Sequence, residues 1–133
     1  MIRADSQPDQ FLTSFTNGQQ VASSDTVADK GGGGRGFRPH ELLEAALATC
    51  MNMSLRMHAQ KHGIPLTGAS VVVSLNRETP AGPTFVCEVR LQGLLSAEQK
   101  NRLLSAVEQC PVRTTLSKGF RFAPFEVGEN SSH

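Results

Sequence analysis

The stretch that decides the fold reads RPHELLEAALATCMNMSLRMHAQKH, residues 38–62. Pro39 suits the first position of a helix, and Gly63 followed by Pro65 ends one, which predicts a long helix over about Pro39–His62. Apolar side chains surround most of its axis, and the polar ones are scattered instead of forming one face. Because one small sheet covers only one side of such a helix, the pattern predicts that a second subunit covers the rest.

Two strands follow this helix, over residues 69–76 and 85–92, because apolar and polar side chains alternate cleanly in both. Ser96 and Gln99 then form the capping-box pattern that opens a second helix. That helix ends before Pro111, since the residue before a proline is pushed out of helical geometry. A short third helix is expected over about 112–118. The alternation of apolar residues predicts a last strand, formed by Phe120, Phe122, Phe125 and Val127.

Upstream of the long helix, alternating residues lead from Phe11 to Asn17-Gly18, which predicts a β-hairpin with a two-residue turn. The stretch GGGGRGFR, residues 31–38, cannot hold a regular element, and we expect a flexible or ligand-covering loop there. The predicted order is β-β-α-β-β-α-α-β, an α+β fold in one domain. Its expected parts are an N-terminal hairpin in 1–30, the glycine-rich loop in 31–38, a core in 39–127 and a loose tail in 128–133.

Length and charge exclude several functional classes. The chain has 133 residues and a mass of 14.3 kDa, the size of one domain. Thirteen Lys plus Arg against twelve Asp plus Glu leave a net charge of +1, which argues against nucleic acid as the main partner. The apolar runs fall far below the roughly 18 residues of a membrane span, and the N-terminus is polar where a signal peptide would be apolar. We therefore expect a cytoplasmic protein that does not bind membranes.

Three motifs carry weak chemical hypotheses. The glycines before the long helix suggest a phosphate cradle, but the Gly-Lys-Ser/Thr ending is missing, so a mobile loop is the better interpretation. His58 and His62 lie one turn apart and suit a zinc ion, but Ala59 stands where a metalloprotease carries glutamate, which favours two surface histidines. Cys87 alternates inward with its apolar neighbours and is predicted to be a small core residue.

Cys50 and Cys110 are more informative as a pair. Cys50 lies seven residues after Leu43 on the apolar stripe of the first long helix, and Cys110 lies seven after Leu103 on that of the second. Both thiols therefore point inward and can meet. Taken alone, each is more often a buried inert thiol. With three cysteines and no sign of secretion, a structural disulfide framework is not expected.

The sequences RPHELLEAALATC (38–50) and CPVRTTL (110–116) resemble the OsmC/Ohr family of osmotically inducible and organic hydroperoxide resistance proteins. The resemblance is to an OsmC-like branch and extends from about residue 31 to 125. Either motif alone is moderate evidence; both together, 60 residues apart in the expected order of elements, form a specific pattern. The implied fold is an OsmC-like α+β fold in an intertwined homodimer, with two sites at the subunit interface.

The resemblance implies a thiol peroxidase that acts on organic hydroperoxides. Cys50 would attack as thiolate and become sulfenic acid, and Cys110 would condense with it to a disulfide. An external dithiol, of lipoyl type for example, would then reduce that disulfide, so no cofactor and no metal are expected. Helix geometry alone predicts that Cys110 is the more acidic thiol, because it precedes the helix that starts at Pro111. The family pattern assigns the attack to Cys50.

In this family an arginine and a glutamate hold the thiolate. Arg38 lies twelve residues before Cys50, about 18 Å along a straight helix. It can reach the thiol only if the glycine-rich loop folds back or the partner subunit donates it; Arg35 is the first choice and Arg38 the second. The family's carboxylate position holds His40 here, and Glu41 follows it, about 180° around the helix from Cys50. The arginine–glutamate pair is therefore either absent or rearranged.

A second functional class stays open at this point. The chain could be a non-enzymatic OsmC-like dimer that binds an apolar small molecule between its subunits. The retained cysteine pair argues for the peroxidase, since a pure binding module has no need for both thiols.

Overall fold

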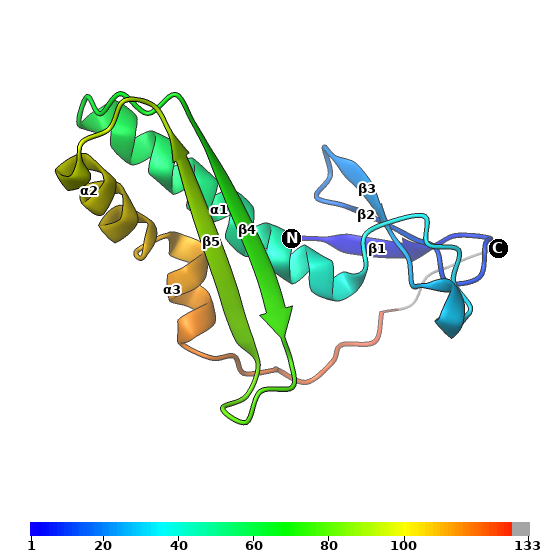
Figure 1. Cartoon of the computed structure of the whole chain (residues 1–133). Helices are drawn as coiled ribbons and strands as arrows, with labels where there is room; N and C mark the ends of the chain where they lie inside the picture. The colour runs from blue at the N-terminus through cyan, green and yellow to red at the C-terminus, as the bar shows by residue number, and fades with distance from the viewer. Residues whose placement is uncertain (129–133) are drawn as a thin grey trace.

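The computed structural model describes residues 1–128 of the chain. The five strands of this part form two antiparallel sheets, β1-β2-β3 and β4-β5, and three α-helices accompany them (Figure 1), which confirms the α+β fold class. The elements are β1 (Arg3–Ser6), β2 (Thr13–Thr16), β3 (Val21–Ser24), the 3₁₀ turn η1 (Ala28–Lys30), α1 (Pro39–Lys61), β4 (Gly68–Asn76), β5 (Thr84–Gln92), α2 (Ala97–Val107) and α3 (Pro111–Ser117). Among residues 1–128, no helix has the length and apolar character needed to cross a bilayer.

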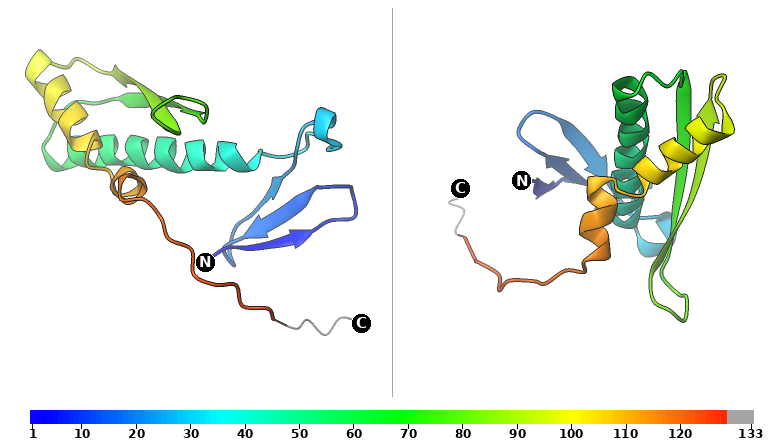
Figure 2. Two further views of the ribbon diagram at one scale, coloured as in Figure 1. Left: turned by 90° about the horizontal axis from the view of Figure 1, so that it is seen from below. Right: turned by 90° about the vertical axis from the view of Figure 1, so that its left-hand side faces the viewer.

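The long helix α1 begins and ends as its sequence predicts. Pro39 occupies the first helical position, and the Glu41 carboxylate accepts a hydrogen bond of 2.8 Å from the backbone N–H of Arg38. The helix stops at His62 because Gly63 adopts φ +63°, a left-handed conformation that glycine tolerates best. The result is a 23-residue helix that runs through the middle of the molecule (Figure 2).

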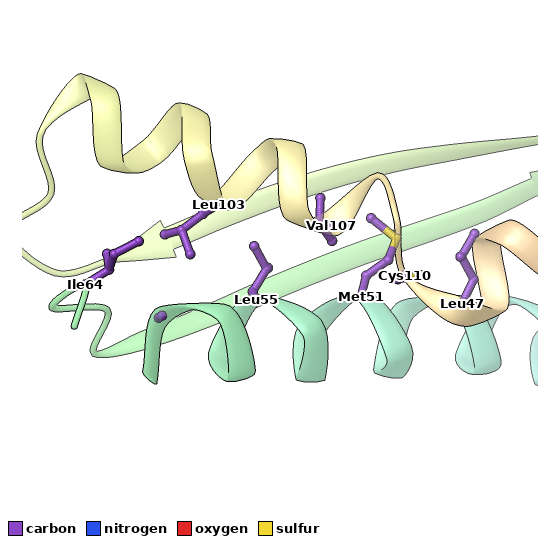
Figure 3. Close-up of a cluster of buried hydrophobic side chains, with 8 residues drawn as sticks. Leu47, Met51, Leu55, Ile64, Leu103, Val107 and Cys110 are labelled. Atoms are coloured by element: carbon purple, nitrogen blue, oxygen red, sulfur yellow. The ribbon is translucent and has the colours of Figure 1, made fainter. Parts of the chain in front are cut away.

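The hydrophobic core lies between α1, α2 and the inner face of the β4–β5 sheet. α1 contributes one stripe at four-residue spacing, and α2 and the segment after it close the core from the other side (Figure 3). The buried members are Leu47, Met51, Leu55, Ala59, Ile64, Leu103, Val107 and Cys110. The alternation predicted for the two strands is confirmed except at Cys87, which is exposed. The residues that pack against this cluster are Ala69, Val71 and Val73 of β4 and Phe85, Val89 and Leu91 of β5.

The opposite side of α1 is not covered within one chain. Met53 is 49% exposed and Met57 is 66% exposed. In Figure 2 the β4–β5 sheet lies along one side of α1, whereas β1–β3 lie on the other side beside the N-terminal end of the helix. The single chain therefore leaves apolar surface along the second half of α1, as the scattered polarity of its sequence predicts.

The N-terminal sheet differs from prediction in two details. The hairpin between β2 and β3 is confirmed, but residues 17–20 form a four-residue turn, in which the Asn17 side chain accepts hydrogen bonds from the backbone N–H groups of Gln19 and Gln20. A third strand, β1, pairs with β2. All four residues of its sequence RADS are exposed, so β1 has no alternation of apolar and polar side chains from which it could be predicted.

The predicted last strand does not form. Residues 120–128 run away from α3 as an unpaired extended segment, on the side of α1 that faces the N-terminal sheet (Figure 2). Phe122 and Phe125 are 93% and 98% exposed. A period of two specifies which side chains share a face, but a strand also needs a neighbour to pair with, and the described chain offers none here. Of the tail predicted over 128–133, all but Gly128 lies outside the described residues.

Candidate active site

The two cysteines singled out by the sequence meet in the structure. Cys50 lies in the middle of α1 and is half-buried, whereas Cys110 is 1% exposed and belongs to the hydrophobic core. Figure 3 shows Cys110 reaching toward α1 beside Met51. Cys50 packs against the core cluster that contains Cys110, and the two thiols lie close enough for Cys50 to influence the pKa of Cys110. The two thiols that the sequence predicts to meet therefore both lie at the hydrophobic core, Cys110 inside it and Cys50 packed against it.

Local backbone geometry places Cys110 at this spot. α2 ends at Val107, and Cys110 has an extended backbone (φ −60°, ψ 141°) as the N-cap of α3, directly before Pro111. Its sulfur accepts a hydrogen bond of 3.4 Å from the backbone N–H of Arg113. The Cys-Pro sequence thus ends one helix, begins the next and holds a thiol at the junction.

Electrostatics at Cys110 contradict the expectation that the start of α3 makes this thiol acidic. Burial raises the pKa of Cys110 above its ordinary value of 9.0, and the neighbouring Cys50 raises it further. The backbone N–H groups of Arg113 and Val112 act in the opposite direction without reversing the net shift. Desolvation in the core therefore outweighs the helix N-terminus, and Cys110 is held as a neutral thiol.

The charged residues predicted to hold the thiolate lie at or before the N-terminal end of α1. The Arg35 guanidinium forms an ion pair with Asp9, and Arg38 forms one with Glu41 at 3.8 Å. Glu41 also caps the helix. In the described part of the chain, none of the three forms a hydrogen bond or ion pair with either thiol. One subunit therefore brings together Cys50 and Cys110, but not Arg35, Arg38 or Glu41.

The residue that organises the glycine-rich loop, Asp25, lies outside every motif in the sequence. Asp25 is buried, and its carboxylate accepts hydrogen bonds from the backbone N–H groups of Thr26 (2.7 Å), Gly33 (3.2 Å) and Arg35 (3.1 Å). The hydrogen bond from Arg35 is the main reason that the pKa of Asp25 lies below its ordinary value. The loop is also bridged to β3, and a Cβ at Gly32 would collide with the carbonyl group of Thr26. The loop expected to be flexible is therefore held by defined hydrogen bonds.

The scattered polar residues of α1 also have a structural role that the sequence did not reveal. The Glu44 carboxylate accepts a hydrogen bond of 2.7 Å from the backbone N–H of Leu75, and the Asn52 amide donates one of 2.9 Å to the Ala69 carbonyl. Both contacts reach β4. Because backbone groups on the edge of β4 that does not pair with β5 need partners, these two side chains fix α1 against the sheet.

The third cysteine is not a core residue, which corrects the prediction for Cys87. Cys87 is exposed and lines an apolar groove of about 960 Å³ between α1, α3 and the two long strands. Partial burial raises the pKa of Cys87, and the charge of Arg113 lowers it by less. Within the described residues, no group of three or more His, Cys, Asp or Glu side chains is arranged to hold a metal ion.

Comparison with known proteins places this fold. Among solved structures, an organic hydroperoxide resistance protein OsmC from Legionella pneumophila is 21% identical, with a TM-score of 0.63 over 87% of each chain. An OsmC-like protein from Mycoplasma pneumoniae is 19% identical, with a TM-score of 0.75 over 88% of this chain and 86% of that chain. The organic hydroperoxide resistance protein OhrB of Bacillus subtilis is 20% identical, with a TM-score of 0.59 over 86% of this chain and 87% of that chain.

A search among curated proteins found no match. The family model of the OsmC-like proteins matches residues 31–123, which contain both cysteine motifs and every element from α1 to α3. The chain therefore belongs to the OsmC-like protein family.

Proposed function

We propose that this protein is a thiol-dependent peroxidase that reduces organic hydroperoxides. The Cys50 thiolate attacks the distal oxygen of the hydroperoxide, the O–O bond breaks, and the products are the alcohol and a Cys50 sulfenic acid. The Cys110 thiol then attacks the sulfenic sulfur, a Cys50–Cys110 disulfide forms, and water leaves. An external dithiol of lipoyl type reduces this disulfide by exchange and becomes a cyclic disulfide itself.

The observation that carries this proposal is the contact between the two thiols. A half-buried Cys50 is open enough to meet a peroxide, and Cys110 belongs to the core cluster against which Cys50 packs. A disulfide between them therefore joins two thiols that already lie in the same cluster. Membership in a family that includes organic hydroperoxide resistance proteins supports the same chemistry. The three free thiols also suit a reducing compartment, and we place the protein in the cytoplasm.

Activation of Cys50 to the thiolate requires a nearby positive charge, and an arginine of a second subunit supplies it. The active unit is a homodimer, supported by the apolar surface that α1 and residues 120–127 leave exposed in one chain. Arg35 of the partner subunit, or Arg38 in its place, approaches Cys50 and stabilises the thiolate, with Glu41 orienting the guanidinium. The hydrogen bonds from the loop to Asp25 support this role, since they hold the backbone of Arg35 in one conformation.

Consumption of a hydroperoxide tests the proposal directly. The wild-type protein, Cys50→Ser and Cys87→Ser are each mixed with tert-butyl hydroperoxide and dihydrolipoamide, and loss of peroxide is followed with time. We expect turnover by the wild type and by Cys87→Ser, and none by Cys50→Ser. Turnover that survives in Cys50→Ser, or is missing in the wild type, contradicts the proposal.

A second candidate is a non-enzymatic dimer that binds an apolar small molecule between subunits. It is favoured by one observation: among residues 1–128, no arginine side chain bonds or pairs with Cys50. The assay separates the two candidates, because a binding protein consumes no more peroxide than its Cys50→Ser variant does.

A further inference from the structure

A polar groove of about 770 Å³ lies between α1 and α2. α2 packs beside the C-terminal half of α1 (Figures 1 and 3), and the groove runs along one face of α2. Neither Cys50 nor Cys110 lines it, so the groove is separate from the cysteine pair. Its polar lining residues are His58 of α1 and Glu98, Asn101, Arg102, Ser105 and Gln109 of α2.

One buried polar atom in the wall of this groove has no partner. The ring nitrogen Nε2 of His58 is buried, yet it forms no hydrogen bond with any group of residues 1–128. Buried polar atoms in folded proteins are ordinarily hydrogen-bonded, so an orphaned nitrogen points to a partner from outside the chain. Because His58 lines the groove, a molecule bound there is positioned to supply that partner after a small rotation of the side chains that cover the ring.

Positive charge from both helices gathers at this corner of the molecule. Arg102 forms no ion pair within residues 1–128. The rings of His58 and His62 lie 4.3 Å apart. Desolvation lowers the pKa of His62, and so do the neighbouring His58, Arg102 and Lys61. Among the lining residues that the structure describes, Glu98 is the one acid, so the corner is suited to a negatively charged ligand.

We propose that the groove between α1 and α2 binds a phosphate, either as the free ion or as the monoester of a small polar molecule. The Arg102 guanidinium donates to two of the phosphate oxygens, and His58 donates from Nε2 to a third. Further donors are the side chains of Asn101, Ser105 and Gln109.

A dianion fits this corner better than a carboxylate does. Arg102 and Lys61 bring two positive charges, and binding of a dianion favours protonation of His62 beside them. The groove also stays open in the proposed dimer. His58 lies about 100° around α1 from Met57, one of the exposed residues assigned to the subunit interface. The inference goes beyond the proposed function and does not depend on it.

Titration of His62 tests the site without any peroxidase activity. The ring signals of the wild-type protein are followed by NMR from about pH 5 to pH 8, the range in which histidine titrates. One series contains sodium sulfate, a dianion throughout this range, and the other contains sodium chloride at equal ionic strength. We expect the pKa of His62 to be higher in sulfate by about half a pH unit, because a bound dianion favours the protonated ring. Equal pKa values in the two salts overturn the inference.

Variants of α2 locate the anchor. Without sulfate, Arg102→Gln should raise the pKa of His62, since one of the charges that lower it is gone, and the response to sulfate should disappear. The matched control Lys100→Gln removes the same charge from an exposed position outside the groove and should keep the response. Glu98→Gln removes the acid and should bind sulfate about twofold more tightly. A full sulfate response in Arg102→Gln overturns the inference.

Amide chemical shifts of α2 distinguish the two sources of the phosphate group. Inorganic phosphate and glycerol 3-phosphate are each titrated into the wild-type protein at one neutral pH, and the amide signals of Asn101 and Ser105 are followed. Tighter binding of glycerol 3-phosphate supports a phosphate monoester as the ligand, and equal binding supports the free ion. Unchanged signals with both probes overturn the inference, whether or not the protein consumes peroxide.

Discussion

At the scale of single residues, burial decides the chemistry of Cys110. A thiol at a helix N-terminus is commonly acidic, yet here desolvation dominates and raises its pKa. A neutral Cys110 suits a resolving thiol that waits for a sulfenic acid, and it leaves the nucleophilic role to Cys50. The position of a cysteine in its helix is therefore a poor guide to acidity when its exposure is unknown.

The raised pKa of Cys110 predicts a pH dependence of stability. In the unfolded chain the thiol ionises near its ordinary pKa of 9.0, whereas in the folded chain it stays neutral to higher pH. Between the two pKa values, the free energy of unfolding therefore falls as pH rises, by about 1.4 kcal/mol per pH unit for this thiol. Urea unfolding of the wild type and Cys110→Ser measures the difference. A decline above pH 9 that is equally steep in both contradicts the assignment.

Asp25 offers a second test at the same scale. Asp25→Asn keeps the shape of the side chain but replaces one accepting oxygen by an amide group, so the N–H groups of Gly33 and Arg35 lose their charged acceptor. We expect faster amide hydrogen exchange at these two residues and unchanged exchange in α2. Asp29→Asn, in the exposed η1 turn, serves as the control. Equal exchange in Asp25→Asn and the wild type would show that the loop does not depend on this carboxylate.

At the scale of elements, the sequence predicted most of what local rules govern. The bounds of α1, the two long strands and the capping box of α2 follow from proline, glycine, alternation and Ser96, which act on neighbouring residues. β1 and the segment 120–127 depend on pairing, which short sequence patterns do not encode. The same distinction applies to the site. The apolar stripes of two helices predicted that Cys50 and Cys110 lie close together, whereas Asp25 and Arg113 belong to no sequence pattern from which their contacts could be predicted.

The core stripe of α1 gives a prediction for one element. Leu55 is fully buried and Leu94 is 94% exposed, so the same substitution has different consequences at the two positions. Leu55→Ala should lower the free energy of unfolding by about 2–5 kcal/mol through lost burial and a cavity. Leu94→Ala should change it by less than about 0.5 kcal/mol. Chemical denaturation compares the two, and similar costs would place Leu55 outside the core.

At the scale of the whole molecule, the exposed side of α1 predicts an obligate homodimer. Light scattering should give twice 14.3 kDa at micromolar concentration, with about 2,000 Å² or more buried, as in permanent interfaces. Met57→Glu puts a charge into the apolar surface and should yield a monomer. The control Arg56→Glu changes the neighbouring exposed residue and should leave the dimer intact. A measured mass of 14.3 kDa for the folded wild-type protein would contradict the dimer and, with it, the site shared between subunits.

The central claim is that Cys50 and Cys110 act as one redox pair, and peptide mass mapping tests it most directly. The reduced wild-type protein is treated with one equivalent of tert-butyl hydroperoxide, its free thiols are blocked, and disulfide-linked peptides are identified. We predict a Cys50–Cys110 disulfide with Cys87 free, and in Cys110→Ser a Cys50 that stops at sulfenic acid or oxidises further. A disulfide that includes Cys87, or a wild-type protein without any disulfide, would contradict the account.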